Sequence, residues 1–245
     1  MNMVTSHFTA IIVNYNGGNL LLDCVRSIMN TGLTPQQIIV VDNGSRDSSI
    51  GHLQQQVAGC RLIMMGCNAG FAKAVNQGLK HTSTDYAILI NNDAQIDPGV
   101  FAALHQAFEA HPRAAFLGGR LLSEDGSLQN AIAPFPRVLF ELLPRPFQRM
   151  LWPQRTEGRY SANQDIQVES VIGALFSIRM TATHSIGLLD EDFFFFLEET
   201  EWCHRAWGLG WEVWHIPSAR AVHLQGATAK KFNALARIEY HRSRL

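Results

Sequence analysis

Two short stretches contain the residues of this sequence that are best suited to chemistry. The first, "LINNDAQIDPG", is an apolar segment that ends in two asparagines and Asp93, and the second, "LEETEW", contains Glu198 and Glu199. An aspartate can bind a divalent cation, which proteins often hold through one or two carboxylates together with substrate phosphates. A glutamate can act as a general base. Both stretches also have a structural interpretation, as a turn and as acids at a helix N-terminus.

The first 110 residues have a pattern that is typical of alternating strands and helices. Apolar runs such as "FTAIIVN", "QQIIVVD" and "DYAILI" alternate with amphipathic stretches such as "NLLLDCVRSIMN" and "AGFAKAVNQGLKH". Nearly continuous apolar runs separated by helical patterns indicate a parallel sheet that is covered on both faces. The predicted fold class is therefore α/β.

Polar residues follow each of the first four predicted strands. They are Asn14, Tyr15, Asn16, Asp42, Asn43, Asn68, Asn91, Asn92 and Asp93. Ligands bind beyond the carboxyl ends of the strands in an open parallel sheet, so these side chains are expected to share one site. The alternative is that each forms a turn after its strand. No G-x-x-x-x-G-K-[ST] or G-x-G-x-x-G motif is present, which argues against an ATPase or a NAD-dependent dehydrogenase.

The second half is less regular. Asp125-Gly126 is a hairpin signal, residues 131–165 are expected to form a mobile loop with a helical piece, and "QVESVIGALFSIRM" is expected to be a strand. Phe193–Phe196 are interpreted as a strand packed on both faces, with an acceptor platform as the alternative. A helix should follow them, then a strand at "WEVWHIP". Residues 229–245 are expected to form a basic amphipathic helix.

Composition and charge indicate the general class of protein. The chain has 245 residues, 47% hydrophobic residues and a net charge of −1, which indicates a globular protein and gives no sign of nucleic-acid binding. Four scattered cysteines are expected to be core thiols. No leader or membrane-spanning run is visible, so a cytoplasmic location is expected. The basic C-terminus could rest on the inner face of an anionic membrane.

The order and spacing of these segments resemble bacterial glycosyltransferase family 2, in particular its rhamnosyltransferase-like members. The resemblance rests on "AIIVNYNGG", "IIVVDNGSRDSS", "NAGFAKAVNQG", "YAILINNDAQIDPG", "GGRLLSEDGSLQ", "VIGALFSIRM", "GLLDEDFFFFLEETEWCHRAWGLGW" and "IPSARAVHLQGAT". It implies a GT-A fold, with a Rossmann-like, mostly parallel sheet, helices on both faces and a smaller acceptor-side region. A single domain would span residues 1–228, with a nucleotide-binding half at 1–97 and an acceptor half at 98–228.

The resemblance also implies a site for a nucleoside-diphosphate sugar. Its predicted contacts are Asn14, Asn16, Asp42, Asn68, Gly70, Asn76, Asn92 and Asp93. The family's Asp-x-Asp-like motif would here be Asn91-Asn92-Asp93, which retains one carboxylate. His223 matches a histidine that completes the metal shell in many GT-A enzymes. A carboxylate with an imidazole suits Mg²⁺ or Mn²⁺, and the missing acid puts metal dependence in question.

On the acceptor side, the resemblance implies that Glu199 is the general base, with Glu198 as the fallback, and that Gly173 and Ala174 lie beside the acceptor. The predicted activity is inverting transfer of a sugar, with rhamnose as a candidate, from a dTDP- or UDP-sugar to a saccharide or lipid-linked glycan in cell-surface polysaccharide synthesis. One alternative is a sugar nucleotidyltransferase, although "NYNGGNLL" is not its glycine- and arginine-rich loop. Another is a non-catalytic nucleotide-sugar binding or scaffold protein, which the weakened metal motif allows.

Overall fold

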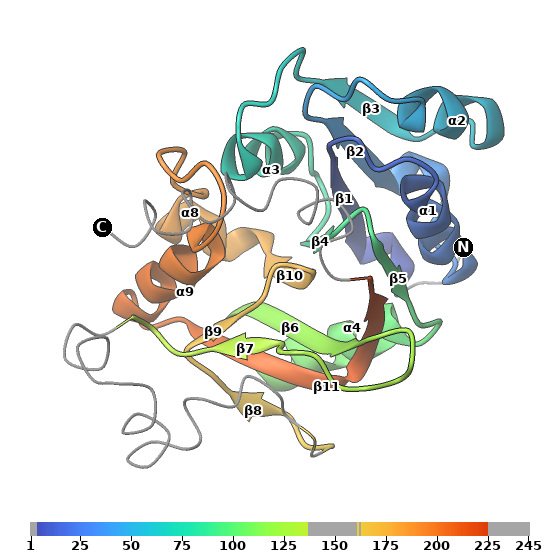
Figure 1. The fold of residues 1–245 in the computed structure, drawn as a ribbon. Coiled ribbons are helices and arrows are strands. Elements are labelled where there is room, and N and C mark those ends of the chain that lie inside the picture. Colours follow the sequence, from blue (N-terminus) through green and yellow to red (C-terminus); the bar gives the residue numbers. More distant parts are fainter. Residues whose placement is uncertain (1–3, 137–160, 162, 225–245) are drawn as a thin grey trace, which may run out of the picture.

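The computed structural model describes residues 4–136, 161 and 163–224 (Figure 1). The strands are β1 (Phe8–Asn14), β2 (Ile38–Asp42), β3 (Arg61–Met64), β4 (Tyr86–Ile90), β5 (Ala94–Ile96), β6 (Ala114–Leu122), β7 (Ile132–Ala133), β8 (Ile166–Gln167), β9 (Ser170–Val171), β10 (Leu175–Arg179) and β11 (Glu212–His223). The helices are α1 (Leu20–Asn30), α2 (Ser49–Gln56), α3 (Phe71–Lys80), α4 (Val100–Ala110), α8 (Met180–Ile186) and α9 (Glu198–Gly208), with short 3₁₀ turns at Thr5–His7 and Pro35–Gln37.

The central sheet has the strand order β3-β2-β1-β4-β10-β6-β11-β5, and β8 pairs with β11 outside this path. The pairings make β3, β2, β1, β4, β6 and β11 run in one direction, while β10, β5 and β8 run against them. The predicted mostly parallel α/β sheet is therefore confirmed. Because β1 lies between β2 and β4, the polar residues that end these three strands meet at one edge of the sheet.

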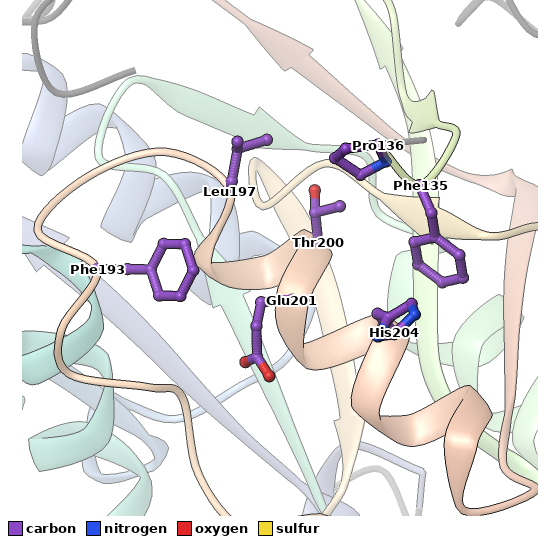
Figure 2. A pocket seen from close by; sticks show the side chains of 7 residues that line it. All are labelled: Phe135, Pro136, Phe193, Leu197, Thr200, Glu201 and His204. Atoms are coloured by element: carbon purple, nitrogen blue, oxygen red, sulfur yellow. The ribbon is translucent and has the colours of Figure 1, made fainter. Parts of the chain in front are cut away.

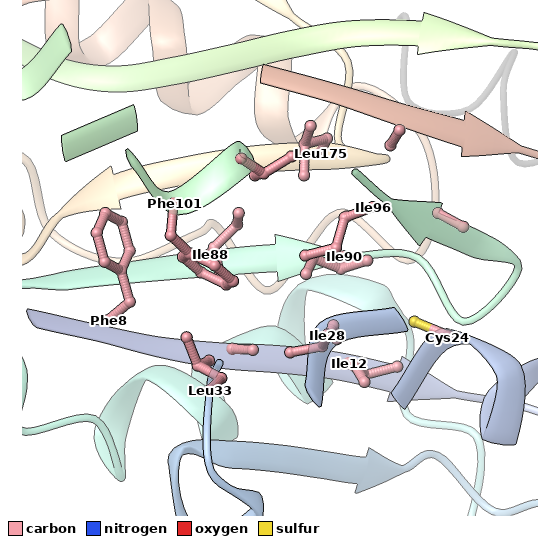
Figure 3. Packing of buried hydrophobic residues seen from close by; sticks show 14 of the residues in the cluster. Phe8, Ile12, Cys24, Ile28, Leu33, Ile88, Ile90, Ile96, Phe101 and Leu175 are labelled. Atoms are coloured by element: carbon pink, nitrogen blue, oxygen red, sulfur yellow. The ribbon is translucent and has the colours of Figure 1, made fainter. Parts of the chain in front are cut away.

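The sheet is covered on both faces because its strands alternate between two cores. Ala10 and Ile12 of β1 pack into a cluster with side chains of α1, α2 and α4, and Ile11 between them packs into a second cluster with side chains of α3, α8 and α9. Ile38 and Ile39 divide in the same way on β2. This alternation has the period of two that strand geometry imposes. Figure 3 shows the first core, in which Ile12 lies near Cys24 and Ile28 of α1.

The prediction of a strand at Phe193–Phe196 is wrong. These residues form an irregular loop that leads into α9, and Phe194 is 40% exposed. Phe196 and Leu197 both have positive φ, 73° and 68°, a conformation that is costly for bulky side chains and incompatible with an extended strand. The chain uses these two residues to turn sharply into α9, which begins at Glu198.

Most other strands and turns in the second half of the chain agree with those predicted from the sequence. "QVESVIGALFSIRM" is divided among β8, β9 and β10, with breaks at residues 168–169 and 172–174. β11 continues beyond the predicted "WEVWHIP", because a shift in register between Ile216 and Arg220 accommodates the intervening proline. The Asp125-Gly126 turn is present, with Leu122 and Leu128 bridged across it. Cys67 is exposed, which contradicts its prediction as a core thiol.

Several predictions concern residues outside the described ranges. These are the helical piece within residues 131–165 and the basic helix at 229–245. The boundaries at residues 97 and 228, the cytoplasmic location and the membrane contact remain predictions. Within residues 4–136, 161 and 163–224, no helix has both the length and the apolar character that crossing a bilayer requires.

Candidate active site

Asn14 connects the ends of three neighbouring strands. Its side-chain amide donates to Asp42 Oδ1 at 3.2 Å and lies within hydrogen-bond distance of the hydroxyls of Ser45 and Ser49. Its Oδ1 accepts a hydrogen bond of 3.0 Å from Nδ2 of Asn92, in the turn after β4. Asn14 and Asp42 are both fully buried. The predicted donor residues Asn14, Asp42 and Asn92 therefore form one connected polar network.

Gly17 must be small for this network to exist. A Cβ at Gly17 would overlap Oδ1 of Asn14 and the Nδ2 of Asn92, the two atoms of the hydrogen bond between them. Asn16, with φ of 53°, accepts a hydrogen bond from the backbone N–H of Arg46 through its side chain and donates its own N–H to Ser45. The "NYNGG" segment is thus fixed against the loop that follows β2.

A second polar cluster lies beside the first. Asn43 donates to Asn68 Oδ1 at 3.0 Å and to the carbonyl of Gly70 at 3.2 Å, and it accepts from the N–H of Ala69. These bonds place the exposed Asn68 next to the end of β2. Gly70 has φ of 94°, and a Cβ there would lie 2.9 Å from the carbonyl oxygen of Phe194. The start of α3 therefore contacts the loop that leads to α9.

Asn76 has a different environment from the other predicted donor residues. Its side chain donates to the carbonyl of Leu189 at 2.9 Å and to Glu191 at 3.0 Å, and it accepts from the N–H of Leu189. It is 2% exposed. All of these bonds hold the segment before α9 against α3, while a donor contact by Asn76 remains a prediction.

Asp93 and His223 lie together, as the sequence analysis predicted. Oδ1 of Asp93 is 3.3 Å from Nε2 of His223, although the two residues come from the turn after β4 and from the end of β11. Two ligands of one octahedral ion, each about 2.1 Å from it, lie about 3 Å apart when they are adjacent. The pair therefore fits a divalent cation such as Mg²⁺ or Mn²⁺. The described residues contain no group of three or more His, Cys, Asp or Glu that could hold a metal, so phosphates and water would complete this shell.

Glu198 and Glu199 form a buried carboxyl pair at the start of α9. Burial and the neighbouring Glu199 carboxylate raise the pKa of Glu198 well above its usual value. Burial also raises the pKa of Glu199, although hydrogen bonds from the backbone of Gly173 and from Glu198 favour its charged form. Among the described residues, the Oε2 atoms of both have no hydrogen-bond partner. The pKa values of both acids are therefore raised, and that of Glu198 is raised well above its usual value.

The carboxyl pair and the Asp93 turn are joined through the backbone. A Cβ at Gly173 would lie 3.8 Å from Oε1 of Glu199, so Gly173 is in contact with the predicted base. The next residue, Ala174, is buried in the core and accepts a 3.3 Å hydrogen bond from the N–H of Asn91 through its carbonyl. Asn91, two residues before the predicted metal ligand Asp93, is thus hydrogen-bonded to the residue that follows Gly173.

A pocket of about 240 Å³ lies against the first turns of α9. It is lined by Phe135, Pro136, Phe193, Leu197, Thr200, Glu201 and His204 (Figure 2). The ring of Phe135 meets that of His204 edge to face, with the ring centroids 5.0 Å apart. The lining combines apolar and aromatic surfaces with one carboxylate and one imidazole, a mixture that is common in small-molecule sites.

Several residues that take part in these networks were not predicted from the sequence, among them Ser45, Ser49 and Gln129. Ser49 bonds Asn14, and Gln129 holds His223 through Oε1, 3.1 Å from Nδ1, and through Nε2, which donates to the His223 carbonyl at 2.6 Å. Ser49 lies in the quoted segment "IIVVDNGSRDSS" and could have been found as a hydroxyl close after a strand end. Gln129 has no such signal, because the contact joins positions 94 residues apart.

Solved structures and sequence relatives identify the class of protein. A crystal structure of GalNAc-T7 with UDP, GalNAc and Mn²⁺ matches this fold with a TM-score of 0.66 at 16% identity, over 88% of this chain and 43% of that chain. The architecture is that of a GT-A glycosyltransferase. The profile described as "Glycosyl transferase family 2" matches residues 9–186, and the chain belongs to this family.

Its sequence relatives include rhamnosyltransferases. An N-acetylglucosaminyl-diphospho-decaprenol L-rhamnosyltransferase of Mycobacterium tuberculosis is 25% identical over 98% of this chain and 83% of the relative. The dTDP-rhamnosyl transferase RfbF of Shigella flexneri is also 25% identical, over 93% of this chain and 72% of the relative. The chain is therefore a rhamnosyltransferase-like member of the family, as the sequence motifs indicated.

Proposed function

We propose that this chain transfers a sugar from a dTDP- or UDP-sugar to a saccharide or lipid-linked acceptor, with inversion at the anomeric carbon, in cell-surface polysaccharide synthesis. Rhamnose is the first candidate sugar, because two relatives are named as rhamnosyltransferases. The observation that supports transfer most strongly is the buried Glu198–Glu199 pair, which contacts Gly173 beside the Asn91–Ala174 hydrogen bond.

The chain's own residues suggest how the donor is held. The network of Asn14, Asp42 and Asn92 is buried, so in this proposal it would act by fixing the strand ends that meet the nucleoside. Asp93 and His223 would hold a divalent cation, which would offset the negative charge that grows on the departing diphosphate. The predicted donor contacts of Asn16, Asn68, Gly70 and Asn76 extend this surface toward α3.

Glu199 is the proposed general base. It takes a proton from the acceptor hydroxyl while that oxygen forms a bond to the anomeric carbon on the face opposite the nucleoside diphosphate, whose bond to the sugar breaks. Glu198 retains its proton and holds Glu199 through their mutual hydrogen bond. A single displacement needs no covalent enzyme intermediate, and it inverts the configuration.

The pocket along α9 is the proposed acceptor subsite. Thr200 and Glu201 of α9 line it directly after Glu199, so an acceptor bound there would lie close to the base. The apolar surfaces of Phe135 and Phe193 suit the nonpolar face of a sugar ring or the start of a lipid chain, and Glu201 and His204 offer hydrogen bonds.

A non-catalytic nucleotide-sugar binding protein is the second candidate, because Asp93 is the single carboxylate in the Asn91-Asn92-Asp93 motif. The carboxyl pair favours catalysis over this alternative. The Oε2 atoms of these two buried acids have no hydrogen-bond partner in the described part of the chain, and such unpaired groups destabilise a fold. A cost of this kind is expected of an acid–base site rather than of a structural contact.

A donor screen tests the proposal. Thermal-shift measurements with dTDP-rhamnose, UDP-N-acetylglucosamine and GDP-mannose, each with and without Mn²⁺, should show stabilisation by a dTDP- or UDP-sugar that increases with Mn²⁺. The donor that binds is then incubated with lipid-linked and free saccharide acceptors, and nucleoside diphosphate release and the anomeric configuration of the product are measured. Donor binding without release of nucleoside diphosphate for every acceptor would favour the non-catalytic binding protein. If no donor binds, both the transferase and the binding-protein proposals are overturned.

A further inference from the structure

Both polar atoms of the Gln129 side-chain amide contact His223, a residue of the proposed cation site. Oε1 of Gln129 lies 3.1 Å from Nδ1 of His223, and Nε2 of Gln129 donates to the backbone carbonyl of His223 at 2.6 Å. Nε2 also donates to the hydroxyl of Ser123 at 3.2 Å. Gln129 is 6% exposed, so these contacts are shielded from water.

The carbonyl of His223 determines which way the Gln129 amide faces. A carbonyl oxygen can only accept a hydrogen bond, so the group 2.6 Å from it must be the amide nitrogen. The amide oxygen then faces Nδ1 of His223. Because this oxygen also only accepts, the contact at 3.1 Å is a hydrogen bond only when Nδ1 carries a proton.

The opposite ring nitrogen points toward Asp93. Nε2 of His223 is 3.3 Å from Oδ1 of Asp93 and 3.3 Å from the side-chain amide of Asn91. A carboxylate oxygen attracts a proton, and a proton on Nε2 would occupy the lone pair that a cation needs. A neutral imidazole has a single N–H, so a hydrogen bond that retains this proton on Nδ1 leaves Nε2 as a ligand.

We propose that Gln129 is a positioning residue that keeps a proton on Nδ1 of His223 and thereby presents Nε2 to the divalent cation shared with Asp93. The inference rests on the proposed function, in which that cation assists departure of the nucleoside diphosphate. The backbone supports the placement of Gln129, since its N–H donates to the carbonyl of Leu121 at the end of β6 at 2.9 Å.

Two substitutions separate the proposed role from a merely structural one. Gln129→Met removes both amide contacts with His223, and the one with Ser123, at similar volume. Gln129→Glu keeps an acceptor for Nδ1–H but loses the donor to the His223 carbonyl. If the proton on Nδ1 matters, Gln129→Met should weaken Mn²⁺ binding about 10- to 100-fold while Gln129→Glu stays within about threefold of wild type. If only the hydrogen bond to the His223 carbonyl matters, the Met and Glu variants should weaken Mn²⁺ binding equally.

The matched control is Gln95→Met. Gln95 is an exposed glutamine on β5, in register with Val222 beside His223, and its substitution should leave Mn²⁺ affinity unchanged. Mn²⁺ affinity is measured directly, from free Mn²⁺ by electron paramagnetic resonance, with no donor or acceptor present. His223→Ala identifies the contribution of the histidine, and circular dichroism confirms that each variant is folded.

A second readout needs neither metal nor activity. In ¹⁵N-histidine-labelled protein, with His223→Asn used to assign the signal, wild type should show a proton directly bonded to Nδ1 of His223, and Gln129→Met should lose its protection from exchange. An unprotonated Nδ1 in wild type overturns the inference, as does absence of Mn²⁺ binding, wild-type Mn²⁺ affinity in Gln129→Met, or equal losses in the Met and Glu variants. Protein that shows the Nδ1 proton and binds Mn²⁺ but transfers no sugar would retain this inference and reject the proposed function.

Discussion

The backbone N–H of Asn91 donates to the carbonyl of Ala174 at 3.3 Å, and this bond joins the two halves of the candidate active site. Asn91 begins the turn that places Asn92 against Asn14 and Asp93 against His223. Ala174 follows Gly173, whose backbone supports Glu199. The strand β10, which pairs antiparallel with β4, therefore brings the acid pair of α9 to the edge where the polar strand ends converge.

Gly44→Ala should destabilise the protein and weaken donor binding. Gly44 has φ of 82°, and a Cβ there would lie 2.6 Å from the backbone carbon of Cys67, next to Asn68. The positive φ alone should lower the free energy of unfolding by about 1–3 kcal/mol, measured by urea denaturation. Gly51→Ala is the control, because a Cβ at Gly51 in α2 meets nothing within 4 Å. It should stabilise the protein by about 0.5–1 kcal/mol. Equal effects of the two substitutions would contradict the structure.

Glu198→Gln should change how stability depends on pH. The pKa of Glu198 is raised above 4.5 in the folded protein by burial and by Glu199, so the folded state holds a proton that the unfolded chain releases. The resulting stabilisation is fully present below about pH 4.5 and is lost as the pH rises through the raised pKa. A glutamine amide is neutral at every pH. The variant should therefore gain stability relative to wild type as the pH rises toward neutrality.

Urea denaturation at a series of pH values measures this difference. Glu109→Gln, which replaces an exposed glutamate of α4, is the control and should follow the wild-type curve. A stability difference between Glu198→Gln and wild type that stays constant across this range would show that Glu198 is not a buried, protonated acid.

Asp93→Asn should remove most of the affinity for Mn²⁺, because it neutralises the single carboxylate of the Asn91-Asn92-Asp93 turn while leaving a side chain of the same size. Substitutions around metal ligands cost about 10- to 100-fold in metal affinity, so loss of a charged ligand should cost at least about 100-fold. Calorimetric titration with Mn²⁺ measures the change. Removal of the metal by a chelator should reduce transfer by wild type to the level of the variant. Transfer that is insensitive to both would exclude a metal role for Asp93 and His223.

The sequence predicts the proximity of those site residues that lie at the ends of strands. Asn14, Asp42 and Asp93 each follow a run of apolar residues, and parallel strands must end at a common edge, so their proximity follows from the pattern. The resemblance to a known family added His223 and Glu199, which come from the remote second half of the chain.

The parts that could not be predicted depend on tertiary contacts. The run Phe193–Phe196 has the composition of a strand, yet the need to turn into α9 forces Phe196 and Leu197 to positive φ. Gln129 follows an unremarkable turn, and its role becomes visible only when β11 brings His223 beside it. Local propensity is overridden at such positions because the site, rather than the segment, determines the conformation.

The most direct test of the account is the comparison of donor binding and sugar transfer in Glu199→Gln, with Asp192→Asn in the preceding exposed loop as the control. If Glu199 is the general base, the variant should bind the nucleotide sugar with wild-type affinity while transfer falls by about 10²- to 10⁴-fold. Asp192→Asn should change neither quantity. Transfer by Glu199→Gln at the wild-type rate would contradict the assignment of the base, and with it the proposal that the carboxyl pair of α9 is the catalytic centre.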